Sequence, residues 1–164
     1  MKCKTQYQER REMSNERPDK VAGRCLCGDV QFEYWGAPLK VLHCHCESCR
    51  RHTSCPITTF VCVDKRSFRY TKAAPAAYAS SPGVTRTHCG HCGSPIAYES
   101  NRNPMQIDLY VGTLTDPNAV EPAFHVHVAQ QLAWFETADV LPRYELAQRE
   151  ATPVRYGPRS RSRC

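Results

Sequence analysis

The chain has 164 residues, enough for one domain with a hydrophobic core and too few for two ordinary domains. Hydrophobic residues make up 41% and charged residues 23%, as in globular proteins, and no apolar run is long enough to span a bilayer. The formal charge is +6, but residues 1–20 and 145–164 together carry eleven Lys/Arg against six Asp/Glu. A nucleic-acid-binding face is therefore not expected on the nearly neutral remainder.

The first twenty residues are polar, with charges scattered through them and no apolar stretch. Such a segment cannot act as a secretory signal, so we predict a cytoplasmic protein with no membrane association. It also lacks the periodicity of a helix or a strand. Residues 1–20 are therefore predicted to be a disordered N-terminal arm.

From Val21 onward, short alternating apolar segments are separated by turns. Twelve prolines and the shortness of the apolar pieces leave little room for long helices, so an antiparallel, mainly β domain is expected over residues 21–144. One short helix is predicted to begin near Glu47. After Tyr144 the sequence turns polar and basic, which predicts a disordered tail over residues 145–164. The predicted strands are residues 30–34, 57–63, 68–70, 77–80, 84–87, 107–111 and 125–128.

Cysteine is the most informative residue type, with eleven copies in the chain. In a reducing compartment stable disulfides are disfavoured, so clustered cysteines indicate metal ligands or catalytic thiols. Seven of the eleven lie at short spacings, which favours metal. They form three groups: Cys25 with Cys27, Cys44 with Cys46 and Cys49, and Cys89 with Cys92.

Zinc bound by thiolates takes four ligands in a tetrahedron, and two cysteines on one tight turn supply two of them. Two such turns far apart in sequence can share one ion and close its coordination. Three thiols on one continuous turn crowd one side of an ion and leave the other side open, as in a catalytic zinc site. The first arrangement fits Cys25, Cys27, Cys89 and Cys92, and the second fits Cys44, Cys46 and Cys49.

The spacing alone leaves other arrangements open. One ion could be shared by the first two groups, through Cys25, Cys27, Cys44 and Cys46, which would leave Cys49, Cys89 and Cys92 for a second ion. Both ions could also be purely structural, with a fourth ligand from Cys55, Cys62 or a histidine. If an open three-thiolate site exists, it should bind an incoming thiol as thiolate beside a second reactant rather than activate water.

Several charged and aromatic residues near these groups are candidate site residues. Arg50 and Arg51 follow the three-thiol turn and could pair with a substrate carboxylate, or be a solvated or packing pair. His125 and His127 alternate on a predicted strand, so both should face one side, either toward the open zinc or as structural histidines. Two further histidines flank Cys44 and are expected to support the site without binding metal: His43 and His45.

The remaining Cys55 and Cys62 are expected to be buried as small hydrophobic residues.

Several spaced motifs, in order, make the chain similar to the glutathione-dependent formaldehyde-activating enzyme family, whose relatives include centromere protein V. The resemblance runs from about residue 23 to residue 144. One departure is Ser54-Cys55, where relatives commonly carry glycine. The motifs are Gly23-Arg-Cys-Leu-Cys-Gly28, Cys44-His-Cys-Glu-Ser-Cys-Arg-Arg51, Cys89-Gly-His-Cys-Gly-Ser-Pro95, Ile107–Leu114 and Phe124–Trp134.

The resemblance implies a β-tent-like zinc fold of twisted antiparallel sheets with one or two short helices. It also implies one pairing of the cysteines: a structural zinc on Cys25, Cys27, Cys89 and Cys92, and a catalytic zinc on Cys44, Cys46 and Cys49. The activity it implies joins or cleaves a thiol–aldehyde adduct such as S-hydroxymethylglutathione, with glutathione as co-substrate.

The sequence therefore predicts a carbon–sulfur lyase with two zinc ions per chain and a small thiol and an aldehyde as substrates. Its predicted catalytic residues are Cys44, Cys46, Cys49, Arg50, His125 and His127. Two alternatives are kept. One is a non-catalytic zinc module that binds a partner or nucleic acid, and the other is an enzyme of the same fold that acts on another thiol adduct.

Overall fold

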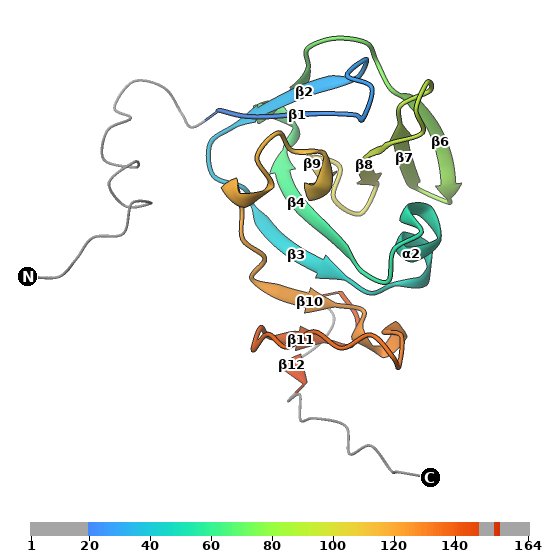
Figure 1. The fold of residues 1–164 in the computed structure, drawn as a ribbon, viewed down its shortest axis with the longest axis vertical. Coiled ribbons are helices and arrows are strands. Elements are labelled where there is room, and N and C mark those ends of the chain that lie inside the picture. Colours follow the sequence, from blue (N-terminus) through green and yellow to red (C-terminus); the bar gives the residue numbers. More distant parts are fainter. Residues whose placement is uncertain (1–19, 148–152, 155–164) are drawn as a thin grey trace, which may run out of the picture.

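A computed structural model describes residues 20–147 and 153–154 of the chain, which form two β-sheets (Figure 1). The predicted N-terminal arm, residues 1–20, lies outside the described residues except for its last residue. The same holds for most of the predicted tail, residues 145–164. The mainly β fold expected from the sequence is confirmed.

The smaller sheet has three strands in the order β1, β2, β5. These strands span Lys20–Arg24, Gln31–Trp35 and Phe68–Tyr70. The larger sheet has nine described strands in the order β12, β11, β10, β3, β4, β9, β8, β7, β6. In chain order they are β3 (Lys40–Cys44), β4 (Thr58–Asp64), β6 (Ala76–Ser81), β7 (Val84–His88), β8 (Pro95–Ser100), β9 (Gln106–Tyr110), β10 (Phe124–Val126), β11 (Arg143–Tyr144) and β12 (Pro153–Val154).

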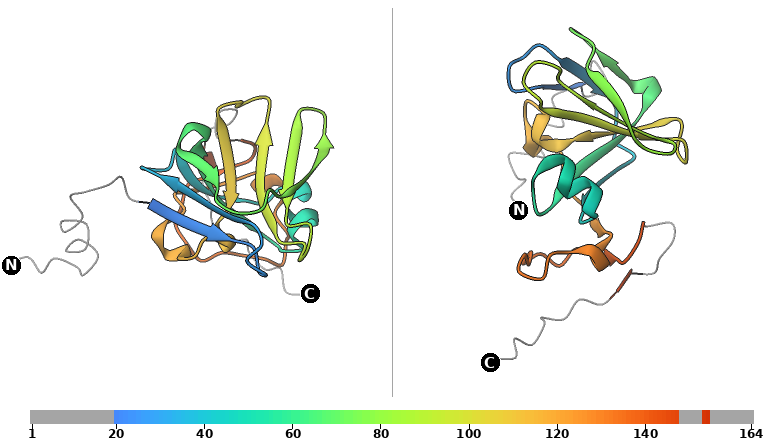
Figure 2. Two further views of the ribbon diagram at one scale, coloured as in Figure 1. Left: turned by 90° about the horizontal axis from the view of Figure 1, so that it is seen from above. Right: turned by 90° about the vertical axis from the view of Figure 1, so that its right-hand side faces the viewer.

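Most neighbouring strands are antiparallel, as expected from the sequence. Short turns join β6 to β7, β7 to β8 and β8 to β9. Strand β10 is the exception, because it runs parallel to both β3 and β11. A parallel neighbour needs a long connection, and residues 127–142 supply one between β10 and β11. The connection from β9 to β10 contains the 3₁₀ turns η2 (Val111–Thr113) and η3 (Pro117–Ala119). Two perpendicular views show the strong twist of the sheets (Figure 2).

The predicted short helix is α2, Glu47–Thr53, which is the single α-helix of the described residues. It begins where the Cys46 side chain accepts a hydrogen bond from the backbone N–H of Cys49. It ends at Ser54, whose φ of 54° lies in the left-handed region that ends many helices. The remaining helical turns are two 3₁₀ segments, η1 (Lys65–Ser67) and η4 (Val128–Gln130).

Alternation along the central strands divides the core into two parts. On β3, for example, Val41 belongs to one buried cluster and Leu42 to the other. The first cluster fills the space between the two sheets and includes Phe32 and Tyr34 of the small sheet. The second lies on the opposite face of the large sheet, beside α2. The same face of the large sheet therefore carries both α2 and the buried side chains of Cys44 and Cys49.

Candidate metal centres and the adjoining cavity

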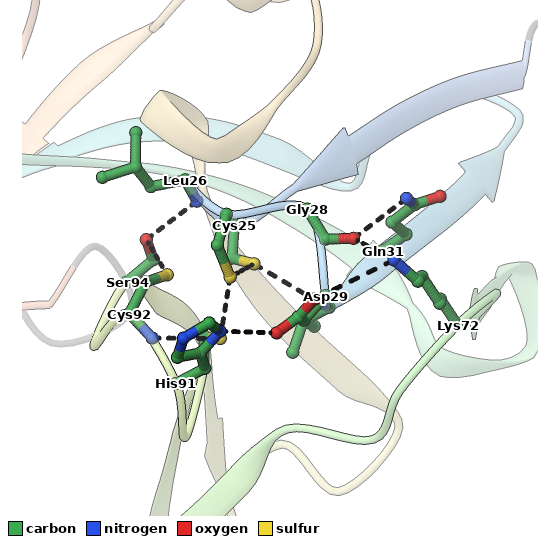
Figure 3. A network of polar contacts seen from close by, with 12 residues as sticks. Cys25, Leu26, Gly28, Asp29, Gln31, Lys72, His91, Cys92 and Ser94 are labelled. Carbon is green, nitrogen blue, oxygen red and sulfur yellow. Dashed lines mark hydrogen bonds and ion pairs between the residues drawn. The ribbon is translucent and has the colours of Figure 1, made fainter.

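Four cysteines from two distant loops meet at one point of the fold (Figure 3). Cys25 and Cys27 follow β1, and Cys89 and Cys92 lie between β7 and β8; their four Sγ atoms are all within 4.8 Å of one another. The Sγ of Cys27 lies 3.4 Å from that of Cys25 and 3.7 Å from that of Cys89. This cluster, the four-thiol cluster, therefore joins the small sheet to the large one.

Backbone and hydroxyl groups already point at these sulfur atoms. The N–H of Val30 donates to Cys25 Sγ at 3.3 Å, and the hydroxyl of Ser94 lies 3.2 Å from Cys92 Sγ. The Ser94 hydrogen bond lowers the pKa of Cys92 to about 5, so a thiolate is favoured there. The turn that carries Cys27 closes at Gly28, whose φ of 81° suits glycine.

The spacing of the four sulfur atoms fits a single zinc ion. A zinc–sulfur bond of about 2.3 Å in a tetrahedron places the sulfur atoms roughly 3.8 Å apart, close to the separations seen here. The donor set is also the one that zinc prefers in structural sites. The four-thiol cluster can therefore hold a metal ion and leaves it no open position.

A second cluster, the three-thiol cluster, is built from one short segment. Cys44 ends β3, Cys46 caps α2, and Cys49 lies in the first turn of that helix; their Sγ atoms are within 4.8 Å of one another. Hydrogen bonds from Cys44 and Cys49 lower the pKa of Cys46 to about 2, and the same contact with Cys46 raises the pKa of Cys44. These contacts favour a thiolate at Cys46, and the cluster can hold a metal ion on three donors.

The three-thiol cluster forms part of the wall of a cavity of about 840 Å³ on the α2 side of the large sheet. A cavity of this size is large enough for a small organic ligand. Its lining comes from seven strands of the large sheet and from α2, and it combines aromatic, cationic and hydroxyl side chains. The lining residues include Lys40, Cys44, Cys46, Cys49, Arg51, His52, Phe60, Tyr78, Arg86, Tyr98, Arg102, Asp108, Phe124, Val126 and His127.

Sequence reasoning missed Arg86, the buried cation of this cavity. Only 3% of the residue is exposed, and its guanidinium donates to the hydroxyl of Tyr110 at 2.8 Å and lies 3.6 Å from Cys49 Sγ. It also lies over the ring of Tyr98, 5.1 Å from the ring centre. Arg86 stands 37 residues from Cys49, so no local motif could have connected the two.

The two arginines that follow the three-thiol turn have different surroundings. The guanidinium of Arg50 donates to the backbone oxygens of His45 and Gln130, and it is not among the residues that line the cavity. Arg51 does line the cavity and pairs with Glu47 one turn earlier on the helix, at 2.7 Å. The structure therefore brings Arg51 to the cavity wall and directs Arg50 to the backbone.

The prediction that His125 and His127 share one strand face is wrong. Strand β10 ends at Val126, and His127 adopts a left-handed conformation with a φ of 57°, which breaks the alternation. His127 consequently lines the cavity, whereas His125 is fully buried away from it. Its partners are His45 and Asp139, each at 2.9 Å.

The remaining candidates differ in burial. Cys62 is fully buried, as expected, but Cys55 is exposed, so the expectation of a buried Cys55 is wrong. Cys55 directly follows Ser54, the left-handed residue at the end of α2. His43 pairs with Thr59 at 2.9 Å, and His45 is fully buried behind its two flanking cysteines.

Comparison with known proteins identifies the family. The model of the family described as "Glutathione-dependent formaldehyde-activating enzyme" matches residues 20–130, which include both thiol clusters. The chain belongs to this family. An uncharacterized lyase of Schizosaccharomyces pombe is 33% identical over 91 residues, which cover 54% of this chain and 66% of that protein. The match thus spans just under two thirds of the relative's length.

A solved structure supports the fold of this family member. The crystal structure of a Rhodobacter sphaeroides protein aligns with a TM-score of 0.50 and 22% identity, over 62% of this chain and 91% of the other. Among the described residues, no helix has the length and apolar character needed to cross a bilayer. The formaldehyde-activating family model ends at residue 130, which is also the last residue of η4, so the segment from 131 to 147 lies outside the match.

Proposed function

We propose that this chain is a zinc-dependent carbon–sulfur lyase that joins or cleaves a thiol–aldehyde adduct. The observation that carries the proposal is the position of the three-thiol cluster in the wall of the cavity, with the buried cation of Arg86 beside it. Family membership and the lyase relative support the reaction class. The substrates proposed are glutathione and formaldehyde, or their adduct S-hydroxymethylglutathione.

The proposed metal content is two zinc ions per chain. Cys25, Cys27, Cys89 and Cys92 would hold the structural ion, and Cys44, Cys46 and Cys49 the one at the cavity. The three-sulfur donor set and a thiolate at Cys46 fit such an ion, and three donors from one turn leave room for a fourth. When bound there, zinc would favour the thiolate form of a substrate sulfur.

The side chains of the cavity would stabilise the negative charge of the thiolates and transfer a proton during the reaction. When an adduct forms, the sulfur of the thiolate bonds to the aldehyde carbon, and the carbonyl oxygen takes up one proton; cleavage is the reverse. Arg86 lies beside Cys49 and offsets the excess negative charge of the thiolates. His127 lines the same cavity and is a candidate to carry the proton. Arg50 is not assigned a contact with substrate.

The lining of the cavity fits an acidic thiol. Four cationic side chains line it, from Lys40, Arg51, Arg86 and Arg102, against the single carboxylate of Asp108 among the lining residues. A surplus of positive charge favours a ligand with carboxylates, such as glutathione. Because the chemistry needs reduced thiols, we propose the cytoplasm as its location.

The experiment combines metal analysis with turnover. The purified chain should contain about two zinc ions by elemental analysis, and it should accelerate formation of S-hydroxymethylglutathione from glutathione and formaldehyde. Cys46→Ser should lose one zinc and the activity. About one zinc in the wild type would contradict the two-site proposal. Turnover of another thiol–aldehyde pair alone would replace the substrate, and no turnover across a panel of such pairs would favour a non-catalytic zinc module.

A further inference from the structure

A chain of hydrogen bonds, buried at its two imidazoles, leads away from the three-thiol cluster through residues that are not among the cavity lining. Asp139 Oδ1 lies 2.9 Å from His125 Nε2, and His125 Nδ1 lies 2.9 Å from His45 Nε2. Both imidazoles are fully buried. His45 stands between Cys44 and Cys46, so the chain of hydrogen bonds ends on the loop that presents these two sulfur atoms.

The carboxylate fixes which ring nitrogens carry protons. Although burial opposes it, the hydrogen bond with His125 lowers the pKa of Asp139 to about 2, so the group is an ionised acceptor. His125 must then donate from Nε2. Burial lowers the pKa of His125 and favours the neutral ring, so its Nδ1 accepts from the Nε2–H of His45. One tautomer of each ring is selected.

Asp139 is itself held in place by its own segment. Its Oδ1 accepts from the backbone N–H of Leu141 at 3.1 Å, and the guanidinium of Arg143 lies 3.4 Å away. Arg143 is 1% exposed and also donates to the hydroxyl of Thr137. Strand β11 pairs with β10, which fixes this segment against His125. Asp139 and the residues that hold it, Thr137, Leu141 and Arg143, lie beyond residue 130, where the family match ends.

At the other end, the backbone of His45 is held on both sides. Its N–H donates to the carbonyl of Val126 at 3.1 Å, and its carbonyl accepts from Arg50. Because both backbone groups are fixed, the hydrogen bond from the side chain to His125 determines how the imidazole of His45 is oriented. The positions of the Cys44 and Cys46 sulfur atoms follow, because they flank His45 directly.

We propose that Asp139, His125 and His45 are positioning residues of the three-thiol metal centre, so that the segment from 131 to 147 is a working part of that centre. The inference rests on the proposed function, because it needs a metal ion at the three-thiol cluster. Partners that orient ligands in this indirect way typically change metal affinity by about 10- to 100-fold when removed. The four-thiol cluster, built from other loops, should be unaffected.

The test measures the affinity of each site separately in the full chain. Zinc is titrated against a competing chelator, and Co²⁺ loading is followed by its sulfur-to-cobalt charge-transfer absorption. Asp139→Asn keeps the shape of the side chain but removes its charge, and His125→Gln breaks the chain while leaving Asp139 and Arg143 in place. The control is Asp116→Asn, because Asp116 also accepts the backbone N–H two residues on, in an exposed turn that carries none of the clustered cysteines.

Both test variants should weaken one zinc site by at least 10-fold and shift its cobalt spectrum, with the other site and the control unchanged. Circular dichroism checks that each variant is folded, and if His125→Gln unfolds, the isosteric Asp139→Asn decides. Unchanged affinities, or equal loss at both sites, overturn the proposal. A wild-type chain that binds no metal at the three-thiol cluster overturns the proposed metal centre as well, whereas unchanged variants overturn only the positioning role.

Discussion

Arg86 is the residue on which the electrostatics of the cavity depend. Lysine at this position would keep the charge but lacks the planar, forked guanidinium that contacts both Tyr110 and Cys49. Hydrogen bonds to charged groups contribute about 1.5–3 kcal/mol, so Arg86→Lys should lower kcat/KM by roughly 10- to 100-fold. Steady-state turnover checks this, with the surface variant Arg66→Lys as control. Equal activity in the two variants would show that Arg86 does not contribute to the reaction.

His52 should make the stability of the protein depend on pH. Burial, and then the nearby charge of Arg86, lowers the pKa of His52 below that of the unfolded chain. The unfolded state therefore binds more protons, and stability is lost as pH falls from about 6.5 toward the folded pKa. In His52→Gln, the free energy of unfolding should fall less between pH 8 and pH 5, as measured with urea. Parallel curves for the two proteins would show that His52 plays no part.

At the scale of elements, the pairing of β1 with β2 depends on the absence of one side chain. Gly23 pairs with Phe32, and a Cβ atom on Gly23 would lie 2.2 Å from the buried Phe32 ring. Gly23→Ala should therefore destabilise the protein by about 1–3 kcal/mol, as overpacked cores do. The control is Gly112→Ala, whose Cβ meets nothing within 4 Å. If urea midpoints fall equally for both variants, steric conflict at Phe32 is not the cause.

The sequence could predict those elements whose determining residues lie close together in the chain. Helix α2 was predictable because the residues that start and cap it lie within a few positions of one another. The central strands were predictable because their side chains point alternately into two apolar clusters, one on each face of the sheet. The end of β10 was not, because a left-handed residue at His127 broke a pattern that still alternates in sequence. Arg86 and Asp139 were missed for another reason: their partners, Cys49 and His125, come from other elements.

At the scale of the whole molecule, the two thiol clusters differ in what they connect. The four-thiol cluster joins loops of the two sheets, whereas the three-thiol cluster comes from one continuous segment, from the last residue of β3 to the first turn of α2. Cys27→Ser should therefore give poorly soluble or unfolded protein, because metal binding there is folding free energy. Cys46→Ser should keep the β-sheet signal by circular dichroism and lose thiol binding. Equal unfolding of the two variants would contradict this division.

The four-thiol cluster also bears on the order in which the chain can fold. Cys27 and Cys89 are 62 residues apart, so an ion that holds both closes a long loop. By analogy with a disulfide of that span, the closure removes on the order of 4 kcal/mol of chain entropy from the unfolded ensemble. During synthesis the first hairpin leaves the ribosome well before its partner cysteines exist. If the proposed ion is bound, the attachment of this hairpin to the large sheet waits until Cys92 has emerged. We therefore expect folding to depend on synthesis of the middle of the chain and on the metal available at that moment.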